Sequence, residues 1–130
     1  MNTKITISAI INSAKQDIDL FCNDDEISIT LKLPNDKEKT YKSTDFYKCF
    51  GQLREDNSNI QFLCKGSQIN VHPSSMSSQM SLGLKAYELT IGKAPSLDDV
   101  VFIFDYEDKN LTNNPKDQRD FYFNWITAKP

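Results

Sequence analysis

The sequence contains few of the side chains from which most metal sites and acid–base sites are built. Its 130 residues include one histidine, His72, and three cysteines, none of them in a CxxC pair. A single histidine excludes a metal site with two histidine ligands, and an odd, scattered set of cysteines predicts neither a disulfide framework nor a zinc knuckle. The GxxxxGK[ST] order of a phosphate-binding loop is also absent. We therefore expect no metal, no cofactor and three reduced thiols.

Long apolar runs and an excess of positive charge are missing as well. The mildly apolar run at 5–11 is short and is interrupted by Thr6 and Ser8, whereas a membrane span needs about 18 or more apolar residues. No signal-peptide cleavage pattern follows this run, so we expect a cytoplasmic protein with no membrane partner. Eighteen acids against fifteen bases give a net charge of −3, which argues against direct nucleic-acid binding.

What the sequence does contain is the composition of an ordinary globular protein, with 38% hydrophobic and 25% charged residues. A chain of this length without repeats or linkers predicts one domain, 1–130, of the α+β class with a mixed or antiparallel sheet. Residues 27–33 alternate apolar and polar at every step, and a turn at 34–36 leads into a polar segment. This pattern predicts an early hairpin over about 27–42, whose polar return arm lies at a sheet edge.

Helical spacing marks two segments in the first half of the chain. Apolar residues recur with this spacing over 7–21 and predict a helix, although the β-branched residues at 5–7 also favour a strand. A second helix is expected after a cap at Ser43 or Thr44. Beyond it the pattern predicts a serine-rich loop over 72–81 and short strands at 60–64, 68–71 and 87–91.

The last third of the chain predicts two further helices. Ser96 is placed to cap a helix with carboxylates in its first turn, and this helix would run to Phe104. The β-forming residues at 100–104 fit a strand as the alternative. A C-terminal helix over about 115–127 begins at Pro115, and we expect it to pack onto the core through an apolar face made of Phe121, Tyr122, Trp125 and Ile126.

The acidic residues are concentrated in two windows that contain no base. Each window holds five acids, and the rest of the chain carries eight acids and fifteen bases, or +7. Charge separation of this kind attracts a cationic partner, although charge runs also occur on faces that only contact solvent. The candidate partner-binding residues are, first, Asp98, Asp99, Asp105, Glu107 and Asp108 with Tyr106 as an aromatic anchor, and second, Asp24, Asp25 and Glu26.

One pair of residues allows an enzymatic alternative. Cys64 and His72 are eight residues apart, on a predicted strand and the loop that follows it. A cysteine beside a histidine is the core of many nucleophilic sites, but such a site also needs a third group to orient the base. Burial of the thiol beside a loop imidazole explains the same two residues without any catalysis.

Three stretches in the second half resemble a family of short bacterial proteins. They are 62–66 (FLCKG), 71–80 (VHPSSMSSQM) and 83–89 (GLKAYEL), and the likeness continues at Gly92, Asp99–Val101, Ile103–Asp105, Gln118, Phe121, Tyr122 and Trp125. Relatives of this kind include immunity proteins of contact-dependent growth inhibition and other polymorphic toxin systems. Where such relatives tend to be glycine-rich, this chain has Ser81 and Leu82. The shared stretch fits either a functional site or a structural role in which Met76 and Met80 fill the core from the loop.

The resemblance implies a non-catalytic protein that binds and neutralises a cognate toxin. Its partner would be the toxin's C-terminal domain, of a basic nuclease type, whose active site or adjacent exosite an acidic surface can cover. The alternatives from other classes are a small cytosolic enzyme that uses Cys64 and His72, and an interaction scaffold without a toxin partner.

Overall fold

The chain begins with a long antiparallel hairpin, not with a helix. In the computed structural model, which describes residues 2–128, β1 (Asn2–Ile11) pairs along its whole length with β2 (Ala14–Asn23). The predicted helix over 7–21 is therefore wrong. Asn12 and Ser13 form the turn, with φ angles of 51° and 65°, the left-handed pair that a two-residue hairpin turn requires.

The predicted hairpin at 27–42 is confirmed and extends the first one into a sheet. It consists of β3 (Ser28–Lys32) and β4 (Glu38–Lys42), and β5 (Ile60–Phe62) joins the opposite side. The strand order is β4-β3-β2-β1-β5 with every pair antiparallel. The polar strand β4 forms one edge, as its composition predicts, and β5 forms the other.

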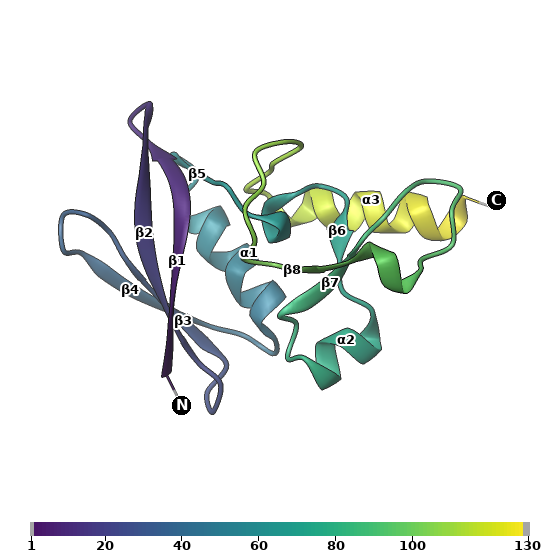
Figure 1. The fold of residues 1–130 in the computed structure, drawn as a ribbon, viewed down its shortest axis with the longest axis horizontal. Helices are drawn as coiled ribbons and strands as arrows, with labels where there is room; N and C mark the ends of the chain where they lie inside the picture. The colour runs from purple at the N-terminus through teal and green to yellow at the C-terminus, as the bar shows by residue number, and fades with distance from the viewer. Residues whose placement is uncertain (1, 129–130) are drawn as a thin grey trace.

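Helix α1 (Phe46–Asp56) covers the inner face of this sheet (Figure 1). Its cap is Asp45, rather than Ser43 or Thr44, because the Asp45 carboxylate accepts a 2.7 Å hydrogen bond from the Lys48 amide. Phe46, Phe50 and Leu53 are almost completely buried, and together with the inward residues of β1, β2 and β3 they form the core.

A second, smaller sheet follows, with the order β6-β7-β8 (Figure 1). Its strands are β6 (Val71–His72), β7 (Lys85–Glu88) and β8 (Val100–Phe102), and the short helix α2 (Ser75–Met80) connects the first two. The strand expected at 68–71 thus begins three residues later, behind the 3₁₀ turn η1 (Lys65–Ser67). The structural interpretation in which Met76 and Met80 fill the core is wrong, because α2 lies on the surface and leaves Met80 81% exposed.

The helix expected after Ser96 is also wrong beyond its first turn. Ser96 and Asp99 form a capping box, but it supports only the 3₁₀ turn η2 (Leu97–Asp99), and the strand alternative holds from Val100. Val100 and Val101 are β-branched, which favours a strand, and their backbones pair with β7.

The C-terminal helix is confirmed as α3 (Pro115–Thr127), with Asn114 as cap and proline at its start. Its inward residue, however, is Gln118, and the predicted apolar face of Phe121, Tyr122, Trp125 and Ile126 is only partly covered, with Ile126 51% exposed. A polar contact takes the place of the expected apolar one: Arg54 of α1 donates a 2.7 Å hydrogen bond to Gln118.

The α+β fold class is confirmed, with the larger sheet antiparallel throughout. The three cysteines are free and buried. Within residues 2–128, no helix has the length and apolar character needed to cross a membrane.

Candidate functional site

The acidic window at 98–108 does not form one continuous patch. Strand β8 runs through its middle, so Asp98 and Asp99 lie on η2 before the strand and Asp105 to Asp108 lie in the segment after it. Asp99 is used in the fold itself: it accepts the Ser96 backbone amide at 3.0 Å and lies 3.4 Å from the Lys93 ammonium. The amide hydrogen bond and this lysine hold the pKa of Asp99 below its ordinary value.

The segment after β8 is held against the edge of the large sheet. Tyr106 forms an isolated β-bridge with Cys64, the Lys65 amide donates to the Asp105 carbonyl at 2.8 Å, and the Glu107 amide donates to the Leu63 carbonyl at 3.2 Å. The backbone on both sides of Tyr106 is therefore fixed. The side chains of Asp105, Tyr106 and Glu107 therefore project from a backbone whose position is fixed by pairing with residues 63–65.

The Tyr106 side chain lies on the outside of this segment and is 50% exposed. Lys15 of β2 donates a 3.0 Å hydrogen bond to its hydroxyl, and the same ammonium lies 4.6 Å from the ring centroid. The hydrogen bond to Tyr106 raises the pKa of Lys15. Lys15 thus contacts both the hydroxyl and the ring of Tyr106 and favours one orientation of this exposed side chain.

Of the acids around Tyr106, Glu107 points inward and the other two point to solvent. Lys65 lies 2.9 Å from Glu107 and 3.1 Å from Glu88, and this ammonium lowers the pKa of Glu107. Asp105 and Asp108 are exposed, and neither has an ion pair within residues 2–128. We call Lys15, Asp105, Tyr106, Glu107 and Asp108 the Tyr106 surface.

The second predicted acidic site, Asp24 to Glu26, is not brought to the Tyr106 surface. It forms the turn between β2 and β3, at the opposite end of β2 from Lys15. The Asn23 side chain accepts the backbone amides of Asp25 and Glu26, at 3.0 and 3.3 Å, and Glu26 lies 3.6 Å from Lys42. These acids therefore form a separate, structured turn.

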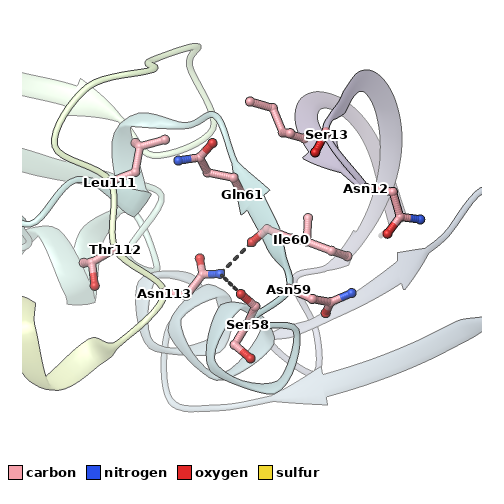
Figure 2. A pocket seen from close by; sticks show the side chains of 10 residues that line it. Asn12, Ser13, Ser58, Asn59, Ile60, Gln61, Leu111, Thr112 and Asn113 are labelled. Atoms are coloured by element: carbon pink, nitrogen blue, oxygen red, sulfur yellow. Dashed lines mark hydrogen bonds between the residues drawn. The ribbon is translucent and has the colours of Figure 1, made fainter.

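The structure contains a recess that the sequence did not reveal (Figure 2). It has a volume of about 550 Å³ and lies between the β1–β2 turn, β5 and the segment at 111–113. Of the described residues, none that lines it is charged, and most carry amides or hydroxyls. They are Ile10, Asn12, Ser13, Ser58, Asn59, Ile60, Gln61, Leu111, Thr112 and Asn113. We call this feature the amide recess.

Asn113 fixes the wall of the amide recess. Its amide nitrogen donates to the Ile60 carbonyl at 2.6 Å and to the Ser58 carbonyl at 3.5 Å (Figure 2). The recess is a hydrogen-bonding surface without a titratable side chain, so it can bind neutral polar groups but offers no acid or base.

The strand register joins the recess to the Tyr106 surface. Ile10, which lines the recess, is the direct cross-strand partner of both Lys15 on β2 and Gln61 on β5. Residues paired in this way project to the same face of the sheet. Lys15, which contacts Tyr106, and Gln61, which lines the recess, therefore lie on the same face of the sheet, one on each side of β1. Their distance along the chain hid this from sequence analysis.

Cys64 and His72 show none of the features of an activated pair. Cys64 is fully buried, and this burial raises the pKa of its thiol to about 12, whereas a nucleophilic cysteine needs a lowered pKa. His72 stacks on Tyr122 with ring centroids 4.0 Å apart, and its Nδ1 lies 2.8 Å from the Pro73 carbonyl. Each side chain has a complete structural environment of its own.

Among the described residues, no three His, Cys, Asp or Glu side chains are grouped so that they could hold a metal ion. The chain matches no protein-family model and no curated protein.

Proposed function

We propose that the protein is an immunity protein that binds and neutralises a cognate toxin domain through the Tyr106 surface and the adjoining amide recess. The observation that carries this proposal is the exposed Tyr106 ring, held by Lys15 and by the pairing of its backbone with Cys64. The resemblance of residues 62–89 to immunity-type proteins gives the class of partner.

The physical argument is preorganisation. Binding an exposed aromatic side chain normally costs free energy because the side chain loses rotamer freedom, and here the free protein already restrains Tyr106. Asp105 and Asp108 place two carboxylates beside this anchor, where they complement the basic, phosphate-binding cleft of a nuclease-type toxin. The amide recess adds neutral hydrogen-bonding groups, so the surface combines a projecting ring with a hollow.

The structure narrows the set of residues proposed for the contact. Glu107 acts as a positioning residue because Lys65 binds its carboxylate, and Asp99 supports η2. Asp98, Asp24, Asp25 and Glu26 lie away from Tyr106 in the fold and form secondary candidates. The proposal includes a cytoplasmic location, which three free cysteines support.

Titration of the purified chain with the toxin domain encoded beside its gene tests the proposal. Tyr106→Ala is expected to raise the Kd about 30-fold, as loss of an interface hot spot does, and to abolish protection of cells that express the toxin. The double variant Asp105→Lys/Asp108→Lys is expected to weaken binding as well. Glu38→Lys is the matched control, since Glu38 is an exposed acid on β4, the opposite edge of the sheet.

Two results would overturn the proposal. The first is a gene neighbourhood without a toxin, together with no protection by the unaltered chain. The second is binding by the Tyr106 and Asp105/Asp108 variants that equals binding by the Glu38 control, which would remove this surface from the interface.

A further inference from the structure

A second hollow lies between α1 and α3, away from the residues assigned to the toxin. Its volume is about 360 Å³, within the usual size of small-molecule sites. Tyr47 and Gly51 of α1, His72 of β6, and Pro115 of α3 form its apolar walls. We call it the α1–α3 pocket, and it shares no lining residue with the amide recess.

The aromatic wall of this pocket is rigid. The Tyr47 hydroxyl donates a 2.7 Å hydrogen bond to the Val71 carbonyl, and the Tyr47 and His72 ring centroids are 5.4 Å apart. His72 is supported from its other side by Tyr122, with the ring planes only 13° from parallel. Tyr47 is only 7% exposed, so a ligand meets a small but fixed part of this aromatic wall.

Close packing of the two helices shapes the pocket. A Cβ at Gly51 would lie 3.3 Å from the Pro115 side chain, which is tighter than an ordinary van der Waals contact. Glycine at this position therefore sets how closely α1 and α3 approach.

The charges around the pocket favour an anion. Lys48 and Arg119 line it and have no ion pair within residues 2–128, and Glu55 is the one carboxylate in the lining. Burial lowers the pKa of His72, so its ring is neutral at neutral pH. Two cations and one carboxylate give the lining a net charge of +1.

We infer that the α1–α3 pocket binds a small planar organic anion, of the aromatic carboxylate class. The ring of such a ligand contacts the wall made by Tyr47 and His72, and its carboxylate lies between the Lys48 ammonium and the Arg119 guanidinium. Arginine is suited to this role because its planar fork matches a carboxylate. This site stands independently of toxin binding, so failure of either proposal leaves the other intact.

Amide-resolved NMR titration of the full chain with sodium 2-naphthoate tests the inference. We expect saturable shift changes at Tyr47, Gly51, His72 and Gln118. The neutral analogue 2-naphthamide is expected to bind more weakly, because it has the same ring system without the charge. The cationic 2-naphthylmethylamine is expected to bind least.

Substitutions then assign the charge recognition to its residues. Arg119→Gln and Lys48→Gln are each expected to weaken 2-naphthoate binding by about threefold, a modest effect because both side chains are exposed, and to leave the fold intact. Lys37→Gln, in the turn between β3 and β4, is the matched control and is expected to change nothing. Equal binding of the acid and the amide, shift changes located elsewhere, or no saturable binding would each overturn the inference.

Discussion

Arg54 is the most unusual side chain in the core. It is completely buried and has no ion pair with any of the described residues, and burial lowers its pKa to about 10. Its Nε donates to the Thr112 carbonyl at 3.2 Å, its Nη2 donates to Gln118, and its guanidinium lies 4.8 Å from the Phe50 ring centroid. Two neutral hydrogen-bond acceptors and one aromatic face thus stabilise the guanidinium charge, a role that a carboxylate usually has for a buried arginine.

This environment predicts that replacing Gln118 lowers the stability of the protein more than replacing Arg54 does. Gln118→Leu leaves the guanidinium charge buried without its side-chain acceptor, and is expected to lower the free energy of unfolding by about 3–5 kcal/mol. Arg54→Met removes the charge itself and is expected to cost less. Urea denaturation of both variants measures the difference, and a larger loss for Arg54→Met would contradict this account.

His72 makes stability depend on pH in a defined direction. Because burial lowers its pKa in the folded state, the unfolded chain takes up the proton first, at its ordinary pKa near 6.5. Stability is therefore expected to fall as the pH drops from about 7 towards 5.5, above the range in which carboxylates titrate.

The variant His72→Phe keeps an aromatic ring against Tyr122 and removes the titrating group. Thermal unfolding of this variant is expected to vary less between pH 7 and 5.5 than that of the unaltered chain. Equal pH dependence in the two proteins would show that another group is responsible.

Among the elements, the first hairpin shows how a short-range pattern can mislead. Spacing over 7–21 fits a helix, yet Ile5, Ile7, Ala9 and Ile11 also alternate on a strand, and the second pattern holds because β2 supplies the partner. The turn residues Asn12 and Ser13 are not the usual Asn-Gly pair, so the break was inconspicuous. By contrast, the hairpin at 27–42 was predictable because its turn and its alternation agree.

The β1–β2 turn provides a direct test of how its backbone conformation affects stability. Ser13 has a φ angle of 65°, a left-handed conformation that is unfavourable for residues with a Cβ and free of that cost for glycine. Ser13→Gly is therefore expected to raise the free energy of unfolding by about 1 kcal/mol. A loss of stability would contradict the turn geometry, and chemical denaturation measures either result.

For α3, the position of the helix was predictable and its buried face was not. Asn114 and Pro115 mark the start of the helix locally, whereas the inward orientation of Gln118 depends on Arg54, which is distant in the sequence. Trp125 lies at the far end of the helix, partly exposed, and donates a 3.0 Å hydrogen bond to the Lys93 carbonyl.

Trp125→Ala is therefore expected to cost about 1–2 kcal/mol, less than the 3–5 kcal/mol typical of a fully buried tryptophan. Denaturant unfolding with a two-state fit gives the value. A loss above about 3 kcal/mol would mean that the end of α3 is part of the core.

At the scale of the whole molecule, the acidic residues occupy separate places in the fold. The two sequence windows located the acids but not which of them are exposed, because Asp99 and Glu107 are held by lysines. The Tyr106 surface also depends on Lys15 and Lys65, which only the folded chain brings to it. The amide recess likewise draws on the β1–β2 turn, β5 and residues 111–113. The Tyr106 surface and the amide recess both arise from pairing between distant strands, which local sequence patterns do not reveal.

The exposed acids act through the field of the molecule, which gives a kinetic prediction. Asp105→Lys/Asp108→Lys is expected to slow association with a basic toxin domain at low salt and to reduce the dependence of the on-rate on salt, because ions screen such charges over about 8 Å at physiological strength. Stopped-flow measurements at low and high salt test this. An on-rate equal to that of Glu38→Lys at both salt concentrations would contradict it.

The hydrogen bond from Asn113 to the Ile60 carbonyl limits which edge of the large sheet can accept another strand. Strand β5 would otherwise present unused backbone groups to an incoming extended peptide, but Asn113 occupies one of them and Tyr106 pairs with the next part of the chain at Cys64. The outer side of β4, in contrast, has no neighbouring strand among residues 2–128, and β4 carries lysines. A peptide that adds a strand to the large sheet is therefore expected to dock along β4, where Lys39 and Lys42 favour acidic side chains.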